Sequence, residues 1–251
     1  MIGAIIGDIV GSRFEFDNTN RMDFDLFTPE CDYTDDTICT IAIADAILNG
    51  KSYKDSLLEW CRKYPNPKGA YGSSFVRWIH SDDPQPYNSF GNGSAMRVSP
   101  VAWLFEPREM MYEAKRTAVV SHDHPEGIKG AIAVTHAIFW LKTTKDLRGL
   151  FYAMDKYYHN IAGMSFKCNV FNETCQETVP LSIQIIACSN SFEDAIRLAI
   201  AHGGDSDTIG AIVGSMAEAY YGVPSAIKDQ ALSYLPEDMK KIINQFNKVI
   251  C

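Results

Sequence analysis

The stretch from residue 203 to residue 220 reads GGDSDTIGAIVGSMAEAY. After its polar start, apolar or small side chains stand at positions 209, 212, 213, 216, 217 and 220. Spacings of three and four residues place them on one face of an α-helix. The stretch therefore predicts a helix over 207–221 that buries one face and carries carboxylates at its N-terminal end.

A second acidic helix start occurs far earlier, where TDDT at 34–37 precedes the apolar residues Ile38, Ile41 and Ala42. If the two starts meet in the fold, their carboxylates and hydroxyls form an oxygen-only ligand set, which suits hard cations such as Mg²⁺ or Mn²⁺. The simpler alternative is that each start is an ordinary helix N-cap. A cap needs only one such residue, however, and closely spaced carboxylates repel one another unless a cation lies among them.

An EF-hand is a poor alternative for the second start. Counted from Asp205, loop positions 5 and 12 are Ile209 and Met216, where a calcium loop needs oxygen ligands.

Composition fits one large globular domain or two small ones, and we predict a single domain over residues 1–251. Of these, 46% are hydrophobic and 22% are charged, which provides a large core. The net charge is −8, and no run of Lys or Arg is longer than two residues. Non-specific nucleic-acid binding through a basic surface is therefore not expected. A substrate linked to nucleic acid remains open, since a local pocket could hold one end of it.

The seven cysteines are odd in number and form no C-x-x-C pair. This pattern disfavours zinc and predicts reduced thiols in a cytoplasmic protein. The apolar start of the chain is short and is interrupted by Asp8, so we expect neither a signal peptide nor a membrane span.

Helical periodicity dominates the chain and predicts an all-α fold with its loops gathered over one face. The expected helices are 2–12, 36–49, 53–63, 72–79, 94–103, 108–120, 125–141, 146–158, 178–188, 191–202, 207–221, 224–232 and 236–248. The expected long loops are 14–28, 81–93 and 159–177.

Gly3, Gly7 and Gly11 recur every four residues in the first predicted helix. Glycine is costly in a helix unless another backbone approaches closely. We therefore expect a helix–helix contact along this face. Asp8, on the same buried helix, is expected to be a structural hydrogen-bond partner rather than a metal ligand.

Six motifs occur along this chain in the same order as in a known protein family. They are GDIVGSRFE at 7–15, YTDDT at 33–37, GAYG at 69–72, SFGNGSAMR at 89–97, SH at 121–122 and GGDSDT at 203–208. On these motifs the chain resembles the ADP-ribosylglycohydrolases of the dinitrogenase-reductase-activating glycohydrolase type.

The resemblance implies an all-α orthogonal multi-helix bundle with a dinuclear Mg²⁺ (or Mn²⁺) site at clustered helix ends and loops. It implies that one ion is bound by Thr34, Asp35 and Asp36, and the other by Asp205 and Thr208, with Asp207 bridging both. The implied reaction is hydrolysis of the glycosidic bond between ADP-ribose and an acceptor, which is a protein, a small molecule or a nucleic acid.

Glu15 and Asp36 are the candidate catalytic carboxylates. Cleavage of a glycosidic bond builds oxocarbenium-like charge on the ribose, and a nearby carboxylate can act as general acid or base. The sequence does not separate the roles of these two residues.

The glycine-rich motif is expected to bind the diphosphate, because Gly91 and Gly93 permit backbone conformations that turn N–H groups toward an anion. The resemblance also places His122 near the phosphates or the proximal ribose. The simpler interpretation of the glycine-rich motif is an ordinary turn capped by Ser94. The simpler interpretation of His122 is that it and His124 are residues at the start of a helix. The full expected substrate set is Gly69, Tyr71, Gly72, Ser89, Phe90, Gly91, Asn92, Gly93, Met96 and His122.

Three alternatives to hydrolysis of ADP-ribosyl bonds remain: a non-catalytic binder of ADP-ribose or a related nucleotide, a structural protein on the same scaffold, and a different metal-dependent hydrolase. The first two predict lost metal ligands. Acceptor choice is expected to depend on loops 14–32 and 159–177, and the protein is expected to be a monomer.

Overall fold

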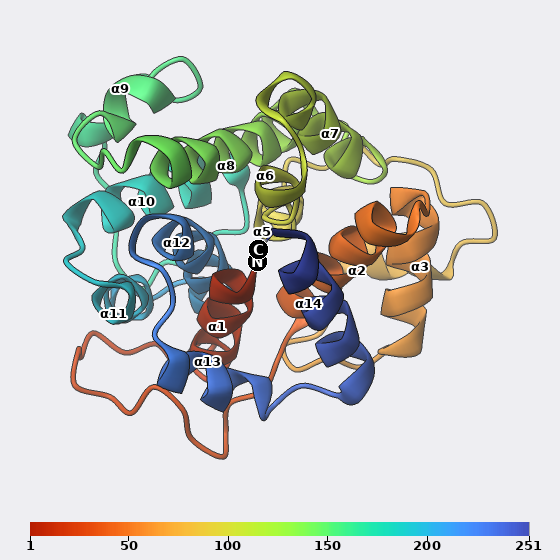
Figure 1. Cartoon of the computed structure of the whole chain (residues 1–251), viewed down its shortest axis with the longest axis horizontal. Coiled ribbons are helices and arrows are strands. Elements are labelled where there is room, and N and C mark those ends of the chain that lie inside the picture. The colour runs from red at the N-terminus through yellow and green to blue at the C-terminus, as the bar shows by residue number, and fades with distance from the viewer. Residues whose placement is uncertain (251) are drawn as a thin grey trace.

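The structure is a computed structural model that describes residues 1–250. This part of the chain is helical and contains no β-strand, which confirms the all-α prediction. Figure 1 shows helices running in several directions around a centre formed by α1 and α12. The α-helices are Ile2–Gly11 (α1), Asp35–Asn49 (α2), Tyr53–Lys63 (α3), Ser73–His80 (α4), Gly93–Met96 (α5), Val101–Leu104 (α6), Pro107–Val119 (α7), Pro125–Thr144 (α8), Leu150–Met154 (α9), Cys175–Cys188 (α10), Phe192–His202 (α11), Ser206–Tyr221 (α12), Ser225–Leu232 (α13) and Glu237–Ile250 (α14), with a short 3₁₀ helix at Ile161–Gly163.

Helices α1 and α12 pack with their backbones in contact. A Cβ atom added to Gly7 would lie 1.8 Å from the carbonyl oxygen of Gly210, and one added to Gly3 would lie 2.2 Å from that of Gly214. No side chain fits at such distances, so glycine is required on both helices. The close helix contact expected from the glycine spacing is confirmed.

Asp8 joins α1 to the start of α2. Its fully buried carboxylate accepts hydrogen bonds from the backbone N–H and the hydroxyl of Thr34, at 3.0 and 2.8 Å. It also accepts from the N–H of Thr37, at 3.0 Å, and from the Thr37 hydroxyl. Asp8 is therefore the structural hydrogen-bond partner that the sequence predicted.

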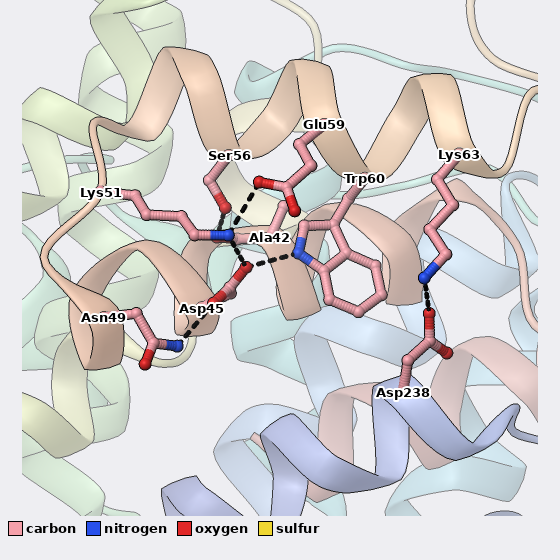
Figure 2. A network of polar contacts seen from close by, with 9 residues as sticks. All are labelled: Ala42, Asp45, Asn49, Lys51, Ser56, Glu59, Trp60, Lys63 and Asp238. Carbon is pink, nitrogen blue, oxygen red and sulfur yellow. Dashed lines mark hydrogen bonds and ion pairs between the residues drawn. The ribbon is translucent and has the colours of Figure 1, made fainter.

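A polar network fixes α2 against α3 (Figure 2). Asp45 on α2 accepts hydrogen bonds from the Trp60 indole N–H, at 2.7 Å, and from the Lys51 ammonium group, at 2.9 Å. The Lys63 side chain pairs with Asp238 on α14. These contacts join the C-terminal part of α2 to α3, and α3 to α14.

Three predicted segments differ from the structure. The helix expected over 94–103 is two short helices, α5 and α6, because Pro100 has no N–H to donate and disfavours a helical conformation at the residue before it. The helix expected over 146–158 is reduced to α9. The loop expected over 159–177 contains the 3₁₀ helix Ile161–Gly163 and ends earlier than expected, because α10 begins at Cys175 rather than at residue 178. Helix α10 contains Pro180 near its N-terminal end.

Two of the long loops lie side by side. The N–H of Asn92 donates to the carbonyl of Glu173, at 2.7 Å, and the N–H of Cys175 donates to that of Phe90, at 3.0 Å. This pairing brings segment 172–175 beside the glycine-rich motif. Within residues 1–250, no helix has the length and apolarity needed to cross a bilayer.

Candidate functional site

The two acidic helix starts meet in the fold. The Thr208 hydroxyl at the start of α12 donates to Asp36 Oδ2 at the start of α2, over 3.1 Å. Carboxylate oxygens of Glu15, Asp205 and Asp207 lie within 4.8 Å of one another. All five side chains line one cavity of about 240 Å³. Residues 15, 36 and 205–208 thus form a single acidic cluster, although they are remote in sequence.

The start of α12 is held by backbone conformation and by side-chain amides. Gly203 and Gly204 have φ angles of 74° and 88°, which favour glycine. The Asn18 amide accepts from the N–H of Gly204, at 2.8 Å, and donates to its carbonyl, at 3.0 Å. Asn92 donates to Asp205 Oδ2, at 2.6 Å. The glycine-rich motif and the acidic cluster are therefore directly connected.

Burial and mutual repulsion make the carboxylates of the cluster hard to ionise. Burial, followed by the charge of Asp207, raises the pKa values of Asp36 and Asp205. The same two causes raise the pKa of Glu15 to about 8. Burial also raises the pKa of Asp35 and Asp207. The cluster therefore holds protons to a higher pH than isolated carboxylates do.

Three buried oxygens of this cluster have no hydrogen-bond partner in the described residues: Glu15 Oε2, Asp36 Oδ1 and Asp207 Oδ1. Buried polar atoms are almost always paired, so three unpaired acceptors in one cavity indicate that a positive ligand belongs there. The side chains of residues 15, 36, 205, 207 and 208 offer only carboxylate and hydroxyl oxygens as ligand atoms. This set fits a hard divalent cation.

Glu15 lies on the loop that follows α1, and Gly69 makes room for it. A Cβ atom on Gly69 would lie 2.3 Å from Glu15 Oε2, and the φ angle of Gly69 is 79°. Gly69 thus shapes the position of the candidate catalytic carboxylate.

The glycines of the 89–97 motif lie beside the His122 ring. Neither Gly91 nor Gly93 has a positive φ, and the Gly91 N–H already donates to Ser89 Oγ at 3.1 Å. A Cβ atom would lie 3.6 Å from His122 Nε2 at Gly91 and 3.0 Å from it at Gly93. The distance at Gly91 is an ordinary van der Waals contact, whereas that at Gly93 is tight. Glycine at position 93 therefore permits the close approach of the imidazole ring.

Most of the expected substrate residues surround the same cavity: Gly72, Ser89, Gly91, Asn92, Gly93, Met96 and His122. Tyr71 is buried and donates its hydroxyl to the Tyr64 carbonyl at 2.8 Å. Phe90 is 46% exposed, with its ring centre 5.3 Å from that of His124. Thr34 is fully buried and is not among the residues that line the cavity; its hydroxyl donates to Asp8.

Sequence reasoning gave no role to several other cavity residues, among them Tyr87, Arg97 and Glu173. Arg97 was visible as the last residue of a recognised motif, but nothing in the motif shows where its side chain points. Glu173 has no local signal at all, because it reaches the cavity through the pairing of two loops. Asn18 was missed for the same reason.

Comparison with known proteins agrees with this geometry. The family model for ADP-ribosylglycohydrolase matches residues 1–250. "ADP-ribosylhydrolase ARH3" of Danio rerio is 24% identical, over 90% of this chain and 82% of that protein. "ADP-ribosyl-[dinitrogen reductase] glycohydrolase" of Rhodospirillum rubrum is 22% identical, over 76% of this chain and 69% of that protein.

One further relative is named for ADP-ribosylarginine, and one solved structure is similar in fold. "ADP-ribosylarginine hydrolase Tri1" of Pseudomonas putida (strain GB-1) is 25% identical, over 89% of this chain and 70% of that protein. A solved structure titled "ADP-ribosylglycohydrolase-related protein complex" shares the fold, with a TM-score of 0.75 at 21% identity; the match covers 100% of this chain and 97% of that one. Because the family match extends over residues 1–250, this chain belongs to the ADP-ribosylglycohydrolase family.

Proposed function

We propose that this protein is a Mg²⁺-dependent hydrolase that cleaves the glycosidic bond between ADP-ribose and an acceptor. The observation that carries the proposal is the set of three buried, unpaired carboxylate oxygens, on Glu15, Asp36 and Asp207, around one cavity. The family match alone supports the reaction class. The unpaired oxygens support the further proposal that this chain has the carboxylates needed to bind the cations.

The cation ligands we propose are Thr34, Asp35, Asp36, Asp205, Asp207 and Thr208, for two Mg²⁺ ions, with Mn²⁺ as the alternative metal. When bound, the cations would supply charge that orients the ribose and acidifies water. The hydroxyl of Thr208 and the amide of Asn92 already orient the carboxylates of Asp36 and Asp205.

Glu15 is the residue we propose to carry the proton, with Asp36 as the alternative. In the cation-free chain, burial and the charge of Asp207 raise the pKa of Glu15 to about 8. Glu15 is not in the proposed ligand set, so its carboxyl group can act as a general acid or base. Asp36 has a hydrogen bond from Thr208 on one oxygen and belongs to the proposed ligand set, so Glu15 is freer to exchange a proton.

The residues around the other part of the cavity would bind the nucleotide. Ser89, Asn92 and His122 offer polar groups, and Gly91, Gly93 and Met96 provide close packing. Gly69, Gly72, Tyr71 and Phe90 are proposed as further contributors to the same region.

The acceptor we propose is an ADP-ribosylated protein. Two relatives are named for dinitrogen reductase and for ADP-ribosylarginine, and small-molecule or nucleic-acid acceptors are the alternatives. Glu15 and Glu173 come from the two loops expected to select the acceptor, and both line the cavity.

We further propose a single-domain, cytoplasmic monomer. Cytoplasmic location is supported by the free thiols, since Cys31, Cys39, Cys61, Cys168, Cys175 and Cys188 form no disulfide among residues 1–250. A non-catalytic ADP-ribose binder is the second candidate function. It has little need for a complete acidic cluster, and the cluster is complete here.

The test is release of free ADP-ribose from arginine-, serine- and nucleobase-linked ADP-ribose, with Mg²⁺ and with a chelator. We expect Mg²⁺-dependent release from at least one substrate. Binding of ADP-ribose without release from any substrate would favour the non-catalytic binder, and release that survives chelation would contradict the metal assignment.

A further inference from the structure

Arg97 is a fully buried cation without an anionic partner. Its side chain is 1% exposed, and none of the ion pairs within residues 1–250 includes it. One guanidinium nitrogen donates to the Thr117 carbonyl and to Ser121 Oγ, both at 2.9 Å. Burial of an unpaired charge costs free energy, so a buried guanidinium group beside the cavity indicates a functional role for Arg97.

The contact with Ser121 determines where the serine proton goes. Ser121 is fully buried, and its hydroxyl contacts only Arg97 and His122 Nδ1, the latter at 2.8 Å. A guanidinium group can only donate, so Ser121 Oγ must accept from it. The serine hydrogen is satisfied only if it is donated to His122 Nδ1, because a buried O–H without an acceptor costs free energy.

The proton position on Ser121 in turn determines the state of the His122 ring. A ring nitrogen that accepts a hydrogen bond carries no hydrogen, so the neutral ring must carry its hydrogen on Nε2. Burial, followed by the charge of Arg97, lowers the pKa of His122 well below its usual value and keeps the ring neutral. Nε2 is the atom that lies against the cavity-lining Gly91 and Gly93.

We propose that Arg97 is a positioning residue which, through Ser121, holds His122 as the neutral Nε2–H tautomer and so presents a hydrogen-bond donor to acceptor oxygens of the nucleotide at the glycine-rich motif. The part concerning the nucleotide rests on the proposed function. The part concerning the tautomer rests only on the contacts of Arg97, Ser121 and His122. No proton transfer to substrate is required of His122 in this role.

The first test is nitrogen NMR of the full chain labelled with ¹⁵N-histidine, with His122→Asn identifying the His122 signals among the six histidines. We expect Nδ1 to be unprotonated and Nε2 protonated between pH 6 and 8. A ring protonated on Nδ1, or on both nitrogens, would overturn the proposal. This readout needs no turnover, so it is independent of the proposed function.

The second test is calorimetry with ADP-ribose. Ser121→Ala should give a mixed tautomer and weaken ADP-ribose binding about tenfold or more, as expected for a lost hydrogen bond to a charged group. Ser121→Thr, which keeps the hydroxyl, should restore the tautomer. Ser99→Ala is the matched control, because the Ser99 hydroxyl is also buried but has no partner within residues 1–250, and it should change neither quantity.

A double-variant cycle assigns the effect to Arg97. Arg97→Met should shift the tautomer as Ser121→Ala does, and the double variant should be no worse than either single one, because both act through the same contact. Additive losses of ADP-ribose affinity, or an unchanged tautomer in Ser121→Ala, would show that Arg97 does not act through Ser121. If Arg97→Met does not fold, the Ser121 variants and the wild-type tautomer still decide the question.

Discussion

The two acidic helix starts share a cavity but are supported in different ways. The start of α2 is held by one side chain in the core, since Asp8 accepts four hydrogen bonds from Thr34 and Thr37. The start of α12 is held by positive-φ glycines and by amides from two loops, those of Asn18 and Asn92. The start of α2 is therefore held by a residue of a buried helix, and the start of α12 is held by residues of loops.

This difference shows how stability and function are divided in the molecule. A substitution that removes the Asp8 carboxylate leaves four buried donors without an acceptor, so it should lower the stability of the whole fold. Damage at Asn18 loosens a loop around the second start and should affect the site more than the fold.

The largest expected effect is therefore on stability. Asp8→Ala should lower the free energy of unfolding by about 3 kcal/mol or more, because several buried donors lose their acceptor. Asn18→Ala, which is only partly buried, should cost about 1 kcal/mol. Urea denaturation of both variants measures the two values. Equal losses would remove the distinction between a core support and a loop support.

The next effect concerns the loop side of the cavity. Glu15→Gln keeps the size and hydrogen bonding of the side chain but removes its charge and its exchangeable proton. We expect kcat to fall roughly 10²-fold if Glu15 is the general acid or base, while ADP-ribose affinity changes much less. Single-turnover hydrolysis and calorimetry separate the two quantities. A normal rate would leave Asp36 as the better candidate, and a lost cation would make Glu15 a ligand.

The last expected effect is a pH dependence of stability, which comes from two buried carboxylates near the cavity. The folded-state pKa values are raised, for Glu15 to about 8 and for Asp8 to about 7, so the folded chain holds protons that the unfolded chain has released. Without a cation, their contribution to stability is therefore present below about pH 4 and is lost as the pH rises toward 8.

Thermal unfolding in chelator between pH 5 and 8.5 measures this trend, and the melting temperature should fall as the pH rises. Glu15→Gln is the matched control, because it removes one of the titrating groups and should flatten the upper part of the curve. A melting temperature that rises over this window would contradict the electrostatic description of the cluster.

The α1–α12 contact and the two acidic helix starts could be predicted from the sequence, because each depends on a pattern of residues that lie close together in the chain. Glycines at every fourth position in α1 indicated a close helix contact, and two polar starts before periodic apolar residues indicated the acidic helix ends. The break at Pro100 could have been recognised from the proline itself. The shortening of α9 has no such local signal.

The remaining part of the site could not be predicted, because it depends on contacts between distant loops. Glu173 reaches the cavity because segment 172–175 pairs with the glycine-rich motif, and Asn18 reaches Gly204 across 186 positions of sequence. Arg97 stood inside a recognised motif, but its burial and its contact with Ser121 follow only from the packing of α5 against α7 and α8.

The central claim is that both acidic helix starts contribute ligands to one dinuclear cation site. Mg²⁺ titration by calorimetry of the wild type, Asp36→Asn and Asp207→Asn tests it most directly, with the exposed Asp82→Asn as control. We expect the wild type and the control to bind Mg²⁺, and each of the other two variants to bind it much more weakly although they alter different helices. Wild-type Mg²⁺ affinity and stoichiometry in either Asp36→Asn or Asp207→Asn would contradict the account.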